Sequence, residues 1–136
     1  MKPFRMSAWG ALSLGLACAG VMPAIAHHSF AVFFDADSNV MVSGIVQEFQ
    51  FRNPHGLIRI TVTGKEGEET WKAETNSPSI LERRGWKRDS LKVGDSIIIE
   101  GWPARDGSHY LRVRAVRRAD GTPIGVPLAE AAGEQR

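Results

Sequence analysis

Apolar and polar residues alternate along much of the chain between residues 40 and 118, a pattern typical of half-buried β-strands. The alternation is strictest in "LIRITVTG" at 57–64. Residues 40–51, "VMVSGIVQEFQF", are rich in β-branched side chains and contain Gly44, which within a strand indicates a bulge or a bend. Three further strands are predicted in "TWKAET" at 70–75, "SIIIEGW" at 96–102 and "HYLRVRAVRR" at 109–118.

A short helix is predicted between the third and fourth strands. In "NSPSILERRG", Asn76 and Ser77 are candidate caps, Pro78 lies in the first turn and Gly85 ends the helix. Three strands, a helix and two strands are the element order of the OB-fold, a five-stranded, partly open barrel. A β-sandwich would need about seven strands, and an SH3-like barrel does not need the helix. We therefore predict an all-β fold, a small five-stranded OB-like barrel with one short helix.

The chain begins with the three parts of an export signal. Lys2 and Arg5 form a basic region before the apolar run "MSAWGALSLGLACAGVM". The following "PAIA" supplies a proline and a small-x-small cleavage pattern. The run is shorter than the ~20 residues of a membrane span. We predict that residues 1–26 are a cleaved Sec-type signal peptide and that the protein is periplasmic or secreted. The remaining segments are a lead-in at 27–39, the barrel at 40–119 and a flexible tail at 120–136.

Processing changes the composition and the charge of the chain. Cys18 is the only cysteine and lies in the predicted leader, so the mature domain has neither disulfides nor thiolate ligands. Removal of Lys2 and Arg5 with the leader leaves 15 basic and 15 acidic residues. This balance gives no general attraction to nucleic acid, and no second apolar run follows the leader. We expect no nucleic-acid partner and no membrane span after cleavage.

Each of the four histidines lies near a chain end or in a predicted loop. His27 and His28 follow the predicted cleavage point. His55 lies in "RNPHG", after the first strand, and His109 lies at the end of the loop between the last two strands. In an OB-fold these two loops flank one binding face. The fold prediction therefore gives the loop histidines a common face.

This distribution of imidazoles indicates a transition-metal site. Imidazole nitrogen is a good ligand for copper and zinc, and a domain without cysteine must bind them through histidine and carboxylate. Cleavage after Ala26 would leave a free amine on His27, whose amine and ring can chelate one ion, an arrangement that resembles the histidine brace of copper proteins. We predict that His27, His55 and His109 bind a metal ion, copper in preference to zinc. His28 assists these three ligands or substitutes for one of them.

Other interpretations of these residues stay open. Loop histidines are commonly solvated or packed on a ring, and a single histidine can instead transfer protons. In the alternative function, the open face of the barrel binds an oligosaccharide, a peptide or a protein partner without metal. Trp102, Tyr110 and Asn53 are the candidate contacts. The chain has no phosphate loop, dinucleotide fingerprint or His-Glu-x-x-His motif, so we predict a binding module and assign no catalytic residues. An exported hydrolase or redox enzyme is the third alternative.

The arginines of the last strand are expected to have a structural role. Those in "RVRAVRR" alternate to the outer face, where they keep an edge soluble and pair with acidic neighbours. The candidate partners are Glu48, Glu74 and Glu100.

Several short motifs are shared with a known family. They are "AHHSF" at the cleavage point, "NPH" after the first strand, "WKAE", "LERRGW", "GD" before the fourth strand and "RDGS" in the last hairpin. With these motifs, from residue 26 to about 118, the chain is similar to an uncharacterised family of small exported bacterial proteins, a domain of unknown function (DUF6152). The resemblance implies an exported small β-barrel and brings no established activity or ligand.

The cleavage point can be tested by mass. Protein expressed with its leader and recovered after export should begin at His27, because Ala24, Ile25 and Ala26 form the small-x-small pattern that the peptidase recognises. Intact-mass spectrometry measures the start to a single residue. A different first residue would contradict the N-terminal amine ligand, and a full-length mass would contradict export.

Overall fold

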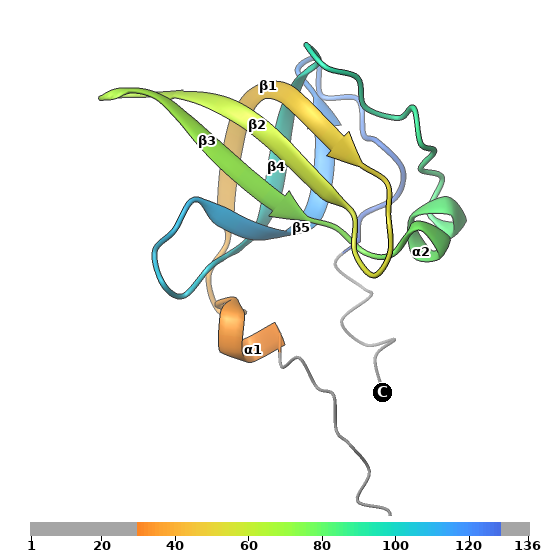
Figure 1. Cartoon of the computed structure of the whole chain (residues 1–136), viewed down its shortest axis with the longest axis horizontal. Coiled ribbons are helices and arrows are strands. Elements are labelled where there is room, and N and C mark those ends of the chain that lie inside the picture. The colour runs from red at the N-terminus through yellow and green to blue at the C-terminus, as the bar shows by residue number, and fades with distance from the viewer. Residues whose placement is uncertain (1–29, 129–136) are drawn as a thin grey trace, which may run out of the picture.

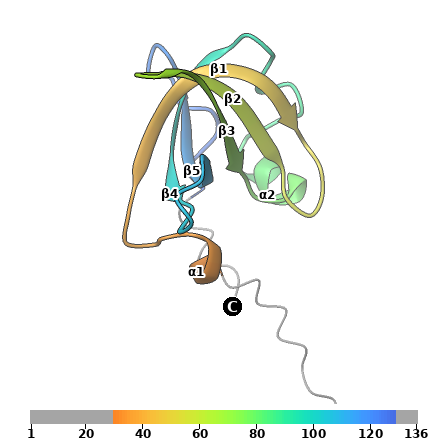
Figure 2. The same cartoon turned by 60° about the vertical axis from the view of Figure 1, so that its left-hand side comes forward.

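A computed structural model describes residues 30–128, in which five strands form a closed barrel (Figures 1 and 2). The strands are β1 (Val40–Gln50), β2 (Leu57–Gly64), β3 (Gly67–Glu74), β4 (Ser96–Pro103) and β5 (Tyr110–Arg118), and they neighbour one another in the order β1-β2-β3-β5-β4. Helix α1 (Phe30–Phe33) precedes the barrel and α2 (Pro78–Arg83) follows β3. The predicted five-stranded OB-like barrel is confirmed, with α1 as an additional single turn. Within residues 30–128, no helix is long and apolar enough to cross a membrane.

Strand β1 bends so that it can pair with two neighbours. Residues 40–45 pair with β4, and from Ile45 onward the strand pairs with β2, with a register shift between Val46 and Glu48. Gly44 lies where the partner changes. A Cβ atom at this position would lie 2.4 Å from the carbonyl oxygen of Thr61, so the close approach of β1 and β2 leaves no room for a side chain.

Strands β3 and β5 close the barrel through a short parallel seam. Three residue pairs are in register there, and the outer two are Lys72 with Tyr110 and Glu74 with Arg112. Residues paired in a parallel ladder point to the same face of the sheet. The seam therefore brings polar side chains from two distant parts of the sequence together on one face of the barrel.

Aliphatic side chains from alternate strand positions fill the barrel interior. Eight of them are at most 1% exposed: Val46, Ile58, Ile60, Ala73, Ile97, Ile99, Leu111 and Val113. Burial of such a side chain contributes about 1.5–3 kcal/mol relative to leaving it in water. Leu81 of α2 and Trp86 pack against the same cluster, so the helix between β3 and β4 belongs to the core.

Ordered packing continues beyond the end of β5. Ile124 and Leu128 are buried in the core cluster, and the amide of Ile124 donates to the carbonyl of Val116 at 2.9 Å. The structure thus differs from the expected flexible tail over residues 120–128. This segment is irregular and makes its apolar contacts through isolated side chains, so it has no periodicity that a sequence pattern could reveal. Residues 129–136 and the predicted leader lie outside the described part of the chain.

The C-terminal segment offers a matched pair of variants. Leu128 is 2% exposed and Val126 is 53% exposed. Leu128→Ala should lower the free energy of unfolding by about 2–5 kcal/mol, because it removes buried methyl groups and leaves a cavity. Val126→Ala should change it by less than about 0.5 kcal/mol. Urea denaturation followed by tryptophan fluorescence measures both values, and equal small effects would show that the segment does not stabilise the fold.

Candidate functional site

A pocket of about 750 Å³ lies over the seam between β3 and β5. Its floor contains Thr70, Lys72 and Glu74 of β3. Its walls are residues 52–56 of the β1–β2 loop, Leu57 at the start of β2, and residues 108–109 of the β4–β5 hairpin. Figures 1 and 2 show this loop and this hairpin at the same lower end of the barrel, together with α1. The two loops that flank the binding face of an OB-fold thus line one pocket here.

The β1–β2 loop is tied to the chain just after β3. The amide of Gly56 donates to the carbonyl of Asn76 at 3.1 Å, and the amide of Thr75 donates to the carbonyl of Gly56 at 2.9 Å. A Cβ atom on Gly56 would lie 2.5 Å from the Thr75 hydroxyl oxygen, so only glycine allows this approach. At the other end of the loop, the buried Phe51 packs in the core. These contacts hold His55 beside the end of β3.

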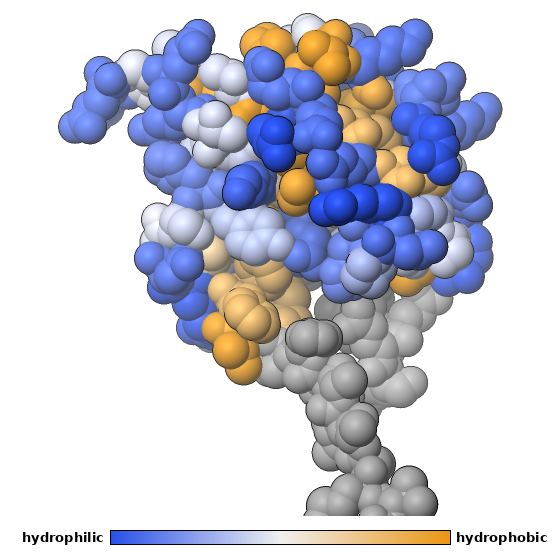
Figure 3. Space-filling model, viewed as in Figure 1, coloured by the Kyte–Doolittle hydropathy of each residue, from blue (hydrophilic) through white to orange (hydrophobic). Residues whose placement is uncertain are grey.

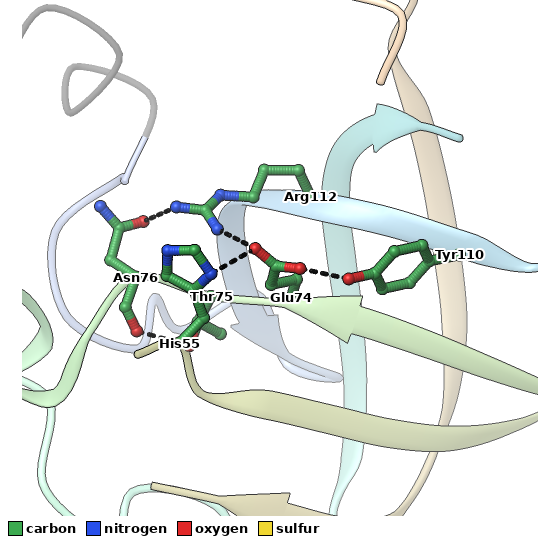
Figure 4. Close-up of polar contacts among 6 residues, drawn as sticks. All are labelled: His55, Glu74, Thr75, Asn76, Tyr110 and Arg112. Carbon is green, nitrogen blue, oxygen red and sulfur yellow. Dashed lines mark hydrogen bonds and ion pairs between the residues drawn. The ribbon is translucent and has the colours of Figure 1, made fainter. Parts of the chain in front are cut away.

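The carboxylate of Glu74 is the centre of the polar contacts at the pocket floor (Figure 4). Its Oε1 lies 2.8 Å from Nδ1 of His55 and 2.5 Å from Nη1 of Arg112. Its Oε2 accepts a hydrogen bond from the hydroxyl of Tyr110. Arg112 also donates from Nη2 to Oδ1 of Asn76 at 3.3 Å. Both oxygens of this carboxylate are therefore engaged by side chains from different elements.

Burial makes this network electrostatically important. The side chains of Arg112 and Glu74 are 10% and 20% exposed, and a buried charge is costly unless it is paired and hydrogen-bonded. Burial raises the pKa of Tyr110 well above its ordinary value of 10.0, and the hydrogen bond to Glu74 and the charge of that carboxylate raise it further. The Tyr110 hydroxyl therefore stays protonated, as a donor, throughout the physiological pH range.

His109 lies on the hairpin wall of the pocket. Its ring is stacked on Trp71, with centroids 4.8 Å apart and planes at 13°. Its Nε2 lies 3.6 Å from a carboxylate oxygen of Glu69, and its carbonyl accepts from the amide of Lys72 at 2.9 Å. The histidine is thus held by β3 on its ring and on its backbone.

Helix α1 is fixed to the same end of the barrel. The Phe34 ring lies 5.5 Å from that of Phe30 and 5.2 Å from that of Tyr110, centroid to centroid. The amide of Arg105, in the β4–β5 hairpin, donates to the carbonyl of Phe33 at 2.9 Å. Figure 3 shows the apolar surface of α1 at the lower left, where Val32 and Phe33 are exposed. These aromatic contacts link α1 through Phe34 to Tyr110, which lines the pocket.

Four of the residues singled out in the sequence line this one pocket. They are His55, His109, Asn53 and Tyr110. Among residues 30–128, no group of three or more His, Cys, Asp or Glu side chains is placed to share a metal ion. Two of the predicted ligands, His55 and His109, thus lie within the described residues and line the same pocket.

The other predicted site residues lie apart from the pocket or outside the described chain. The ring of Trp102 packs edge-on against Phe30, with centroids 4.9 Å apart, and the guanidinium of Arg114 lies 5.1 Å from its centroid. Trp102 is not among the residues that line the pocket. His27 and His28 fall outside the described residues.

Sequence reasoning named Glu74 only as an ion-pair partner. Its pairing with Arg112 is confirmed, as is that of Glu100 with Arg114 at 3.7 Å. The link between Glu74 and His55 was missed, because no sequence signal brings a loop residue to the end of a strand 19 positions later. The sequence analysis also did not identify Arg52 and Lys72, which line the pocket.

Comparison with known proteins assigns the chain to a family. The model of a family of unknown function, DUF6152, matches residues 15–111, which is more than half of the 136 residues. The chain belongs to DUF6152. The resemblance indicated by the short motifs is confirmed. No curated protein sequence matches this DUF6152 chain.

Two solved structures share a likeness with the barrel. The mitochondrial single-stranded DNA binding protein Rim1 from S. cerevisiae matches with a TM-score of 0.47 and 12% identity, over 60% of this chain and 93% of that one. TiaS, in its complex with a transfer RNA and ATP, matches with a TM-score of 0.42 and 15% identity, over 62% of this chain and 19% of that one.

Tyr110 is the only tyrosine in the sequence, so tyrosinate absorbance reports on it alone. The folded protein should form tyrosinate only well above pH 10, the ordinary pKa. Glu74→Gln should lower the pKa of Tyr110, because it removes the neighbouring negative charge, and Glu69→Gln should leave it unchanged. The unfolded chain releases this proton near pH 10 while the folded chain retains it, so this contribution to stability is lost as the pH rises above about 10.

The measurement is a spectrophotometric pH titration with circular dichroism recorded at each point, which restricts the comparison to folded protein. Identical titrations of the wild type and Glu74→Gln in their folded range would contradict the contact between Glu74 and Tyr110.

Proposed function

We propose that this DUF6152 chain is an exported metal-binding module that holds copper(II), with zinc(II) as the second choice, at the pocket. The ligands are His27, His55 and His109, with His28 assisting. The observation that carries the proposal is that His55 and His109 come from separate loops and line one pocket.

The contact between His55 and Glu74 supports a ligand role for this histidine. Metal-binding histidines usually donate the N–H of their second ring nitrogen to a carboxylate or a carbonyl, which fixes the ring and its tautomer. Nδ1 of His55 lies 2.8 Å from Oε1 of Glu74. In Figure 4 the second nitrogen of the ring points away from this carboxylate. Nε2 is therefore the coordinating atom in the proposed site.

The short stretch of chain between His27 and the aromatic contacts of α1 supports a role for the predicted N-terminus. Phe30 is anchored through Phe34 to Tyr110, which lines the pocket. Three peptide steps separate His27 from Phe30 and span at most about 11 Å. After cleavage following Ala26, the amine and ring of His27 would add two nitrogen donors to the imidazoles of His55 and His109. Among the described residues alone, no group of three or more candidate ligands is found.

The donor set favours copper. All the proposed ligands are nitrogen atoms, and for a given nitrogen site Cu²⁺ binds more tightly than Zn²⁺. Coordination requires neutral imidazoles. The affinity should therefore fall as the pH drops below about 6.5, the ordinary pKa of histidine.

A copper titration of the exported protein tests the proposal. We expect one tight site at neutral pH, measured by competition with a coloured chelator. The site should weaken at least tenfold in His55→Gln and in His109→Gln, each of which removes one proposed imidazole ligand. Glu74→Gln should weaken it about 10–100-fold by releasing the His55 ring.

Glu100→Gln is the matched control, because Glu100 also pairs with an arginine of β5 but does not line the pocket. It should leave copper binding unchanged. The absence of a tight site in the wild type, or an unaltered affinity in His55→Gln, would contradict the proposal.

A further inference from the structure

Two cationic side chains line the pocket without a partner in the described part of the chain. Arg52 comes from the β1–β2 wall and Lys72 from the β3 floor, and both are exposed. Within residues 30–128, neither side chain makes an ion pair or a hydrogen bond. Positive charge from two separate elements thus faces the same space.

The acidic side chain of the pocket does not neutralise this charge. Glu74 is the only acidic residue among those that line the pocket. Its carboxylate is paired with Arg112 behind the floor and also engages His55 and Tyr110. With the histidines neutral, Arg52, Lys72 and Arg112 contribute three positive charges and Glu74 contributes one negative charge. The net charge of this group is therefore about +2. The excess belongs to Arg52 and Lys72.

We infer that this pocket binds a small organic carboxylate between Arg52 and Lys72. A guanidinium can hold a carboxylate through two parallel hydrogen bonds, and a lysine adds a mobile second charge. The hydroxyls of Thr70 and Ser108 line the same space and can donate to the body of the ligand. The volume of about 750 Å³ lies within the usual range for small-molecule sites.

This inference goes beyond metal binding and stands on residues 52–112, without the N-terminal histidines. It is also compatible with a metal ion in the same pocket. A divalent cation would add to the positive charge there, so a bound anion lowers the electrostatic cost of the metal, and the metal strengthens the binding of the anion to the same degree.

The probe is 4-fluorobenzoate, observed by fluorine NMR with the exported protein in an excess of chelator and at physiological salt. The fluorine signal should shift in proportion to bound probe, whereas the uncharged 4-fluorobenzamide should show no saturable shift. Arg52→Gln and Lys72→Gln should each weaken binding about tenfold, the factor contributed by a charge-assisted hydrogen bond.

Lys65→Gln is the matched control, because it removes the same charge from the turn between β2 and β3, outside the pocket lining. It should leave the affinity within about twofold, since salt screens distant exposed charges. Equal binding of the amide, no saturable shift with the carboxylate, or equal weakening by Lys65→Gln and the pocket variants would each overturn the inference.

A copper titration of the same samples separates this inference from the metal proposal. Probe binding in chelator by a protein that takes up no copper would support the carboxylate site and contradict the metal site. Copper uptake without probe binding would support the metal site and contradict the carboxylate site.

Discussion

The ion pair between Glu74 and Arg112 is the contact on which the rest of the site depends. The two residues are in register across the short parallel seam that closes the barrel. Loss of one partner of a buried pair costs about 3–5 kcal/mol, because the remaining charge is left uncompensated. Both side chains are largely buried, so this pair joins barrel closure to the geometry of the pocket floor.

The same carboxylate organises the polar groups around it. Glu74 holds His55 from the β1–β2 loop and Tyr110 from the start of β5, and Tyr110 in turn contacts Phe34 beside α1. Segments far apart in the sequence thus meet at one charged group. Because Arg112 compensates that group from behind, the open side of the pocket presents cations and nitrogen donors. This asymmetry underlies both proposals for what the pocket binds.

The fold was largely predictable because its signals are local. The two-residue alternation of the strands, the proline and glycine that bound α2, and Gly44 in β1 can each be read within a short window. The pairing of β3 with β5 joins positions 38 residues apart, and nothing in either strand specifies the register that brings Glu74 to Arg112. The histidines were recognised as candidates from loop position alone. The contact between His55 and Glu74 was not predicted, whereas the pairing of Glu74 with an arginine of the last strand was.

The packing of Ile124 and Leu128 also determines how short a working version of the domain can be. Sequence patterning ends with β5, so a truncated clone would naturally stop near residue 118. Such a clone would lose both side chains from the core cluster and expose part of that cluster to solvent. Newly exposed apolar surface of this kind promotes aggregation. The smallest soluble unit of this barrel therefore extends at least to Leu128.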